Sequence, residues 1–547
     1  MKPLVKRNRV ITIALTTVIL TACATAPSPQ GTIDARNPAT PSSSETTHIL
    51  EKKAQVMQDM GIVATSHLYR QELPVMGYPA IAVAPGEQYS AIAENRQIQV
   101  TDEPVSTFSI DVDTAAYSNI RRFINGGNLP PKNAVRIEEM VNYFDYHYPT
   151  SNDKSVPFKI TTEVGPTPWN TGSHLLHVGI KGYEPAITEP QPRNLVFLLD
   201  VSGSMNSTNK LGLLKKSLRL LVNQLTAQDR VAIVVYAGAS GVVLESTPGN
   251  RRSEIINAME RLRAGGSTNG GAGIELAYSI AQQHFNKDGI NRVILATDGD
   301  FNVGPSNTEA LKTLIKAKKR SGVGLTILGF GMGNYNDQML EAISNAGDGN
   351  AAYIDTLQEA QKVLVEEIGS TLNTIARDTK IQIEFNPEIV NSYRLVGYEN
   401  RLLNKEDFKN DRIDAGDVGA GHTVTALYEI VLNEPLRYSA VQTKALQFNN
   451  ELAFLKLRYK LPDEENSTEM QHAIASDDLN QQLNRTSNNF RFAAAVASFG
   501  QRLRNSDSLG DYSYPEISQL AQQSRGNDTF GYRAEFIQLV NLADSLK

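Results

Sequence analysis

The chain has 547 residues, with 53 Lys and Arg against 59 Asp and Glu, a net charge of −6 and a single Cys. This length predicts several domains, and a hydrophobic share of 41% indicates a globular protein with a sizeable core, which excludes wholesale disorder, collagen and coiled coil. The mild negative charge argues against a basic surface for nucleic acid. One Cys excludes an intramolecular disulfide and any zinc or iron–sulfur site built from cysteines.

The first residues of the chain have the order of a cleavable export signal. Basic residues come first, at Lys2, Lys6, Arg7 and Arg9. Residues 10–20 follow as an uncharged apolar run, which is too short to span a bilayer as a helix and predicts a signal-peptide core. Leu-Thr-Ala then precedes Cys23, an arrangement that resembles the bacterial lipobox, in which the chain is cut before a cysteine that becomes lipidated. We therefore expect a signal peptide over residues 1–22 and a lipid on Cys23.

The residues around Cys23 also bear on localisation. Ala24 stands where Asp tends to retain the lipoproteins of Gram-negative bacteria at the inner membrane, so the resemblance favours a lipid anchor in the outer membrane of the cell envelope. The alternative is an ordinary cleavable signal with a cysteine nearby by chance. Residues 23–48 are rich in Pro, Ser, Thr and Ala and lack aromatic residues, which predicts a disordered tether.

The hydrophobic patterns of residues 49–190 and 379–547 predict strands and helices on both sides of the central region. Residues 49–150 read as a mainly helical flanking region, with a strand-like stretch near its centre. Residues 151–190 alternate apolar and polar side chains and predict strands. The same alternation returns over residues 379–465, which we interpret as a β-sandwich-like module that pairs with the earlier strands. Residues 466–547 are predicted to be helical.

Residues 191–378 alternate between strand and helix patterns. Residues 195–199 form a continuous apolar run, as expected for a parallel strand that is covered on both faces. The helix after it carries one apolar stripe, made of Leu211, Leu214, Leu218, Leu221 and Leu225. Such alternation predicts an α/β fold with a doubly wound, mostly parallel, Rossmann-like sheet. If the strands before and after this region pair, the α/β domain is inserted in the β-sandwich module. Helical segments then lie at both ends.

Short oxygen-bearing side chains gather where strands of this domain end. Asp200, Ser202 and Ser204 form a DxSxS motif directly after the first strand. Thr268 lies in a glycine-rich loop before a helix, and Asp298 follows a later buried strand. Doubly wound sheets bind ligands at this edge. A set of oxygen donors without His or Cys suits a hard cation, with Mg²⁺ as the default and Mn²⁺ as a further possibility.

This combination resembles the von Willebrand factor type A (VWA) domain and its metal-ion-dependent adhesion site. The resemblance implies that Asp200, Ser202, Ser204, Thr268 and Asp298 are the metal ligands. The resemblance to a group of bacterial VWA lipoproteins covers most of the segment from residue 105 to residue 547. In that group, segments similar to residues 111–146 and 490–539 flank the VWA domain.

The resemblance implies binding rather than turnover. Neutral hydroxyl ligands leave the charge of the cation poorly neutralised, so a carboxylate of a partner protein can complete its coordination shell. No small-molecule substrate is evident. One alternative is a metal-dependent hydrolase, and another is a structural envelope protein whose VWA domain does not use metal. An SxxK string, Ser207 to Lys210, also occurs, but the other motifs of penicillin-binding enzymes are missing.

Overall fold

The computed structural model describes residues 87–151, 153, 155–184, 191–267, 270–299, 308–319, 321–333, 335–347, 349–433, 450–462, 464–480 and 482–547. The chain forms two compact units, Met1–Met76 and Gly77–Lys547, and all described residues belong to the second. The predicted signal peptide, the tether, Cys23 and Thr268 therefore lie outside the described residues. None of the helices in the described ranges is long and apolar enough to cross a membrane.

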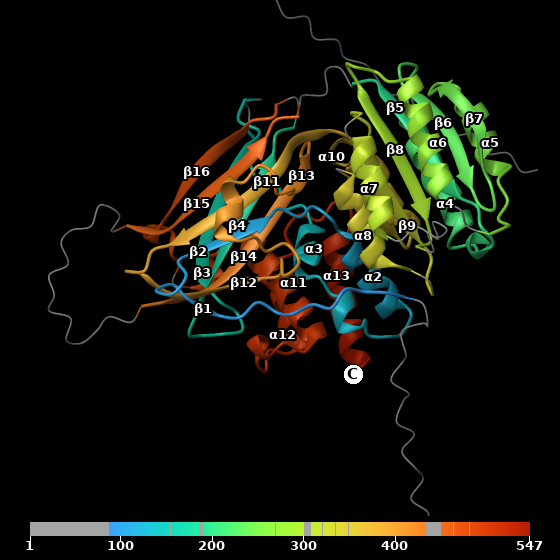
Figure 1. Ribbon diagram of the computed structural model, residues 1–547. Coiled ribbons are helices and arrows are strands. Elements are labelled where there is room, and N and C mark those ends of the chain that lie inside the picture. Colours follow the sequence, from blue (N-terminus) through green and yellow to red (C-terminus); the bar gives the residue numbers. More distant parts are fainter. Residues whose placement is uncertain are drawn as a thin grey trace, which may run out of the picture. The chain divides into compact units, whose positions relative to one another are not determined.

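The α/β domain is built on a six-stranded sheet (Figure 1). Its order is β10-β9-β8-β5-β6-β7, and all neighbours are parallel except β6 and β7. The strands are β5 (Arg193–Asp200), β6 (Arg230–Tyr236), β7 (Ser240–Pro248), β8 (Ile290–Thr297), β9 (Gly324–Phe330) and β10 (Ala351–Ile354). The prediction of a doubly wound, mostly parallel sheet is confirmed.

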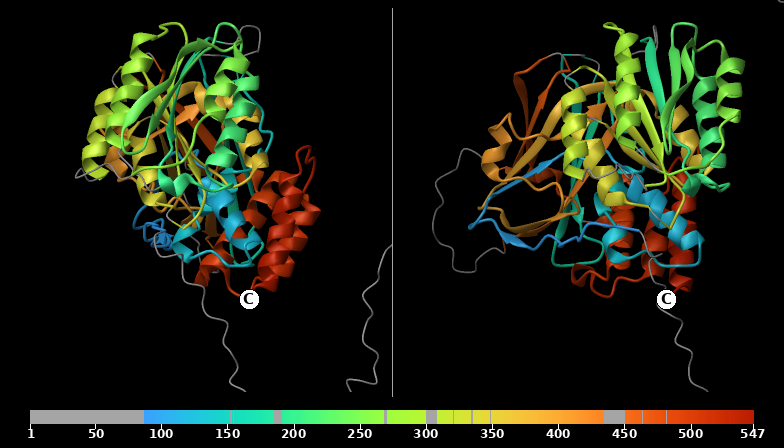
Figure 2. Two further views of the ribbon diagram at one scale, coloured as in Figure 1. Left: turned by 90° about the vertical axis from the view of Figure 1, so that its right-hand side faces the viewer. Right: turned by 45° about the vertical axis from the view of Figure 1, so that its right-hand side comes forward.

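Helices cover both faces of this sheet (Figure 2). Successive side chains of β5 alternate between the two faces, with Leu195, Phe197 and Leu199 in one core and Val196 and Leu198 in the other. The first core is completed by α4 (Leu211–Asn223), α5 (Arg252–Glu260) and α9 (Leu357–Gln361). The second is completed by α6 (Gly270–Gln283), α7 (Thr308–Lys319) and α8 (Asp337–Ala346).

A β-sandwich encloses a third core, to which both of its sheets contribute. One sheet has the order β1-β12-β14-β4-β3; the other has the order β13-β11-β15-β16, with β2 also paired to β11. The strands before the α/β domain are β1 (Ile98–Gln99), β2 (Val105–Ser109), β3 (Phe158–Pro166) and β4 (His174–Gly182). Those after it are β11 (Thr374–Phe385), β12 (Val390–Val396), β13 (Gly416–Gly419), β14 (Thr423–Leu432), β15 (Glu451–Lys460) and β16 (Ser467–Ala475). Because β4 pairs with β14, the α/β domain is an insertion in the sandwich.

A helical core joins the two ends of the described chain. It contains residues of α2 (Ala115–Asn125), α3 (Ile137–Asn142), α11 (Asn488–Arg504), α12 (Tyr514–Gln523) and α13 (Tyr532–Ser545). The remaining helical elements are short: η1 (Lys132–Ala134), η2 (Gly203–Met205), η3 (Lys362–Glu366, a π-helix), α10 (Ile368–Leu372), η4 (Lys405–Lys409), η5 (Ser476–Asp478), η6 (Leu483–Arg485) and η7 (Asp507–Leu509).

Some predicted boundaries are wrong. β16 lies in the region predicted to be helical, because its backbone pairs with β15 along its whole length. β11 begins at Thr374, before the predicted end of the α/β domain at residue 378, because its first residues pair with β13. The end of the predicted α/β domain consists of three short helical elements, α9, η3 and α10. The flanking region before the sandwich also contributes two strands, β1 and β2, to the sheets.

Candidate metal centre

The predicted site lies at the switch point of the α/β sheet. β5 has β6 on one side and β8 on the other, so the chain leaves the middle of the sheet in opposite directions. Ligands bind at the carboxyl ends of strands at such a point. Asp200 is the last residue of β5, and Asp298 directly follows the last residue of β8. Since β5 and β8 are paired, both carboxylates lie at the same edge.

The DxSxS motif folds into a tight turn around its own side chains. One carboxylate oxygen of Asp200 accepts a hydrogen bond of 2.8 Å from the backbone N–H of Ser202. The hydroxyls of Ser202 and Ser204 share a hydrogen bond of 2.9 Å. Asp200 and Ser202 are buried, whereas Ser204 is exposed. The turn thus gathers three oxygen-bearing side chains, one of which faces solvent.

Two further hydroxyls, which lie outside the sequence motifs, hold Asp200. Its second carboxylate oxygen lies 3.2 Å from the Tyr236 hydroxyl and 3.3 Å from the Thr297 hydroxyl. Burial raises the pKa of the Asp200 carboxyl, the hydrogen bonds from Ser202 oppose this, and the charge of Asp298 adds to the increase. Tyr236 and Thr297 end the strands on either side of β5, and this position is the signal that could have identified them.

Asp298 is held by a lysine. The ammonium of Lys210, the residue just before α4, lies 2.8 Å from a carboxylate oxygen of Asp298, and the exposed fractions of the two side chains are 10% and 0%. The SxxK string therefore does not form a catalytic pair here, because Lys210 is directed to Asp298 and the Ser207 hydroxyl donates to Asn209. Gly299 follows with a φ of +90°, and a Cβ there would lie 2.5 Å from the backbone nitrogen of Asn336.

The loop that leads to Thr268 packs against the DxSxS turn. The Gly265 N–H donates to the Val201 carbonyl at 2.8 Å, and the Gly203 N–H donates to the Gly266 carbonyl at 3.1 Å. Gly266 has a φ of +87°, which favours glycine. The structure therefore brings together Asp200, Ser202, Ser204 and Asp298, with the described part of the threonine loop beside them.

The chemistry of these donors fits a hard divalent cation. Two buried carboxylates and two serine hydroxyls converge, and all are oxygen donors of the kind that Mg²⁺ and Mn²⁺ accept. In the described ranges, no group of three or more His, Cys, Asp or Glu is placed to hold a metal. Any cation at this centre would therefore depend on the hydroxyls as well as the carboxylates.

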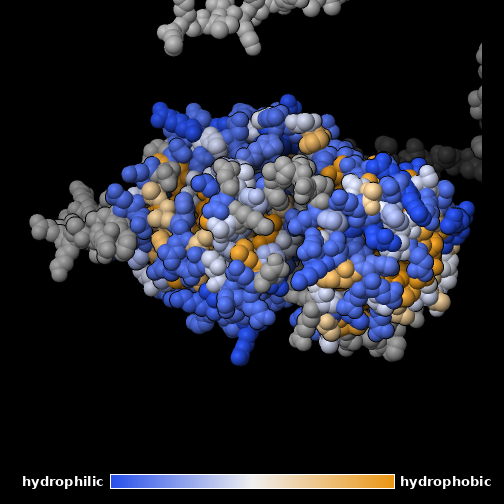
Figure 3. Space-filling view, turned by 90° about the horizontal axis from the view of Figure 1, so that it is seen from above, coloured by the Kyte–Doolittle hydropathy of each residue, from blue (hydrophilic) through white to orange (hydrophobic). Residues whose placement is uncertain are grey.

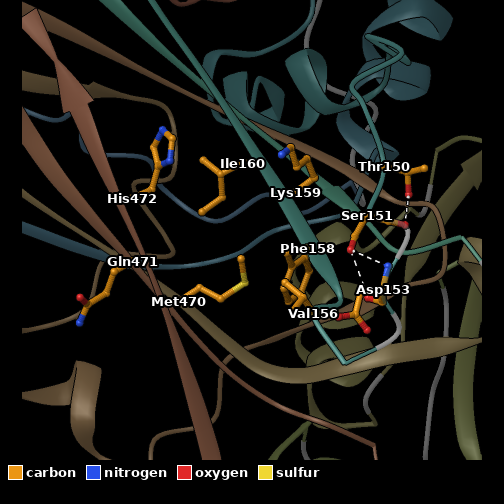
Figure 4. A pocket seen from close by; sticks show the side chains of 10 residues that line it. All are labelled: Thr150, Ser151, Asp153, Val156, Phe158, Lys159, Ile160, Met470, Gln471 and His472. Atoms are coloured by element: carbon orange, nitrogen blue, oxygen red, sulfur yellow. Dashed lines mark hydrogen bonds between the residues drawn. The ribbon is translucent and has the colours of Figure 1, made fainter.

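A hollow elsewhere in the described part of the molecule has no comparable chemistry. It has a volume of about 480 Å³ and is lined by residues of β3, of β16 and of the loop before β3 (Figure 4). The Ser151 hydroxyl donates to the Asp153 carbonyl, and the His472 ring lies 3.3 Å from the Thr162 hydroxyl. Figure 4 shows Ser151 and His472 on opposite sides of the hollow, so they do not form a nucleophile–base pair.

Comparisons with known families agree with this architecture. The profile described as von Willebrand factor type A domain matches residues 194–367, and a profile described as von Willebrand factor matches residues 84–177. A third, described as "Uncharacterized protein YfbK, C-terminal", matches residues 370–546. A solved structure described as von Willebrand factor type A from Catenulispora acidiphila is 17% identical, with a TM-score of 0.40, and the match covers 71% of this chain and 91% of that one.

Two curated relatives extend the comparison. Human inter-alpha-trypsin inhibitor heavy chain H3 is 25% identical over 300 residues, which cover 50% of this chain and 32% of the relative. YfbK from Escherichia coli strain K12 is 46% identical over 495 residues, which cover 87% of this chain and 85% of the relative. The chain therefore belongs to the family of Escherichia coli YfbK, and its α/β domain is a VWA domain.

Proposed function

We propose that this protein binds a protein partner through a metal ion held by its VWA domain. Asp200, Ser202, Ser204, Thr268 and Asp298 would hold Mg²⁺, or Mn²⁺, and a carboxylate of the partner would complete the coordination shell. The observation that carries the proposal is the convergence of buried carboxylates and serine hydroxyls at the switch point of the sheet. The relation to inter-alpha-trypsin inhibitor heavy chains supports a role in protein interaction.

The site is better suited to binding than to hydrolysis. A hydrolase would need a general base near the metal-bound water. The described groups that contact the two carboxylates include the hydroxyls of Tyr236 and Thr297 and the ammonium of Lys210. None of these is a ready proton acceptor at neutral pH. The exposed hydroxyl of Ser204, in contrast, leaves one side of the donor set open to solvent and thus to a partner.

The face of the molecule that is seen from above is mainly polar (Figure 3). On the face seen in Figure 3, hydrophilic residues predominate and hydrophobic residues lie in small groups among them. A contact made through one metal–carboxylate bond does not require a large apolar patch.

Metal binding can be tested with Ser204→Ala. The substitution removes a hydroxyl that would be a metal ligand, so we expect it to weaken Mg²⁺ and Mn²⁺ binding, measured by calorimetry. Because Ser204 is exposed, we expect the free energy of unfolding to change by less than about 0.5 kcal/mol. Ser207→Ala is the matched control, since its exposed hydroxyl bonds to Asn209. Absence of any metal heat in the wild-type protein, or equal heats in wild type and Asp200→Ala, would refute the proposal.

The partner can be sought with the same variants. The full chain is used to capture proteins from solubilised cell envelope in buffer with Mg²⁺ and in buffer with EDTA. We expect a partner that is retained with Mg²⁺, released by EDTA and lost with Asp200→Ala. A partner retained equally in all three conditions would contradict a metal-dependent contact.

We also propose that the protein is anchored to the cell envelope by a lipid on Cys23, with the outer membrane favoured. The support is the order of basic residues, apolar run and sole cysteine. Cys23→Ser is expected to move the protein from the membrane fraction to the soluble fraction, because the acyl chains supply the membrane affinity. Ser28→Ala is the control. Retention of the Cys23→Ser protein in the membrane fraction would refute the assignment.

A further inference from the structure

We propose that Lys210 is a built-in counter-ion of the metal centre. Its ammonium neutralises Asp298 when no metal is bound, competes with the metal for that carboxylate, and leaves the loaded site with a net positive charge that favours an acidic partner. This inference rests on the proposed metal-binding function and deepens it, because it assigns a role to a residue outside the motif.

The ion pair is buried and is made at the site itself. Lys210 lies 2.8 Å from Asp298, whose side chain has no exposed surface, and Asp298 lies close enough to Asp200 to raise its pKa. A carboxylate buried in this way is costly unless it is paired. The ammonium supplies this pairing, so any divalent cation that binds Asp298 must weaken or replace the contact with Lys210.

The aliphatic part of the Lys210 side chain lies against Gly331, whose lack of a side chain leaves room for it. A Cβ on Gly331, at the end of β9, would lie 2.3 Å from Cε and 2.4 Å from Cγ of Lys210. The Gly331 carbonyl accepts a hydrogen bond from the Tyr353 hydroxyl, which fixes this backbone. A side chain at position 331 would occupy the path of this aliphatic part. The fold therefore directs the ammonium toward Asp298 rather than leaving it in solvent.

Charge determines what the ammonium does when the centre is loaded. The two carboxylates and Lys210 together carry one negative charge, so a divalent cation leaves the site with one positive charge. A carboxylate from a partner then makes it neutral. Without Lys210 the loaded site would already be neutral, and a partner carboxylate would leave it negative. Lys210 thus weakens metal binding and strengthens the contact with an acidic group.

The test compares charge variants of the purified full chain after removal of metal by EDTA. Mn²⁺ is titrated and the free ion is measured by electron paramagnetic resonance. We expect Lys210→Gln, which keeps a hydrogen-bond donor for Asp298, to bind Mn²⁺ roughly fivefold more tightly or better, and Lys210→Arg to stay within about twofold of wild type. Lys216→Gln removes an exposed charge from the same helix and is expected to change nothing. Equal or weaker binding by a folded Lys210→Gln protein would overturn the proposal.

The acidic-partner arm uses acetate as the probe. Acetate is added to the Mn²⁺-loaded proteins, and displacement of metal-bound water is followed by proton relaxation. We expect Lys210→Gln to need several times more acetate than wild type. Equal acetate affinity in the two proteins would overturn this part.

A measurement on the wild-type protein covers the case in which Lys210→Gln does not fold. Acetylation by an anhydride is read by mass spectrometry, and Mn²⁺ should increase labelling of Lys210 relative to Lys216. No increase would overturn the proposal that Lys210 competes with the metal for Asp298.

If neither wild type nor Lys210→Gln binds Mn²⁺, the proposed function and this inference both fail. Binding by Lys210→Gln alone would support the inference and refute metal use by the wild type.

Discussion

Glu138 is a buried carboxylate among charges from distant parts of the chain. One of its oxygens accepts a hydrogen bond of 3.0 Å from the Tyr398 N–H, and the other is buried without a hydrogen-bond partner among the described residues. Burial raises the pKa of Glu138 to about 7, and the charge of Glu399 acts in the same direction while that of Arg504 opposes it. The folded protein therefore keeps a proton on Glu138 at pH values where the unfolded chain has lost it.

This shift predicts a pH dependence of stability. Between pH 4.5 and about 7 the folded state binds more protons at Glu138 than the unfolded state, so its contribution to the free energy of unfolding falls as the pH rises. We expect Glu138→Gln to reduce the loss of stability between pH 5 and pH 8 by an amount on the order of 2 kcal/mol. Urea unfolding at the two pH values measures it. A variant that loses as much stability as wild type would contradict the prediction.

At the scale of elements, Arg121 ties the VWA domain to both helical flanks. Its guanidinium, on α2, forms ion pairs with Asp355 after β10, with Glu359 on α9 at 2.7 Å and with Glu535 on α13 at 3.0 Å. The exposed fraction of the Arg121 side chain is 1%. Nearby, the Tyr532 hydroxyl donates to a carboxylate oxygen of Glu366 at 2.9 Å. The closing helices of the VWA domain are therefore held by residues from both flanks.

Removal of this guanidinium should be strongly destabilising. Arg121→Met would leave several buried carboxylates without their cation, and we expect a loss of about 3 kcal/mol or more in the free energy of unfolding. Arg219→Met is the matched control: the Arg219–Glu260 pair is half exposed, so its removal should cost less than about 1 kcal/mol. Fluorescence of Trp169, the only tryptophan, reports the unfolding. Equal losses in the two variants would show that the buried network does not stabilise the junction.

At the scale of the whole molecule, segments from the two sides of the VWA insertion build shared structures. The sandwich pairs β4 with β14 and β2 with β11. The helical core combines residues of α2 and α3 with those of the C-terminal helices. Within α11 alone, nearly every apolar side chain is buried. The parts outside the VWA domain are therefore not separate N-terminal and C-terminal domains.

A truncation tests this interdependence. Removal of residues 488–547 would expose apolar side chains of α2 and α3, which now lie in the helical core. We expect the shortened chain to aggregate or to lose a cooperative thermal transition, measured by soluble yield and circular dichroism. A chain that ends after Leu546, and so lacks only the exposed Lys547, should behave as wild type. A soluble, cooperatively melting protein without residues 488–547 would show that the N-terminal helices are stable by themselves.

Much of the site was predictable because its signals are local. Asp200, Ser202, Ser204 and Asp298 follow buried apolar runs, and the alternation of those runs with amphipathic helices indicates a parallel sheet whose carboxyl ends meet at one edge. The pairing of early and late strands was also predictable from their common alternation. The nature of the donors, all oxygen, follows from the sequence alone.

The sequence by itself determined the α/β class, the position of the VWA domain and the candidate ligands, because periodicity and motifs depend on neighbouring residues. Only the tertiary structure decided which groups hold those ligands. Lys210 reaches Asp298 across 88 positions, and Tyr236 reaches Asp200 across 36. Arg121 meets Glu535 across 414 positions. A buried charge needs a partner, but the sequence does not show which residue that partner is. The partner depends on how the strands and helices pack against one another.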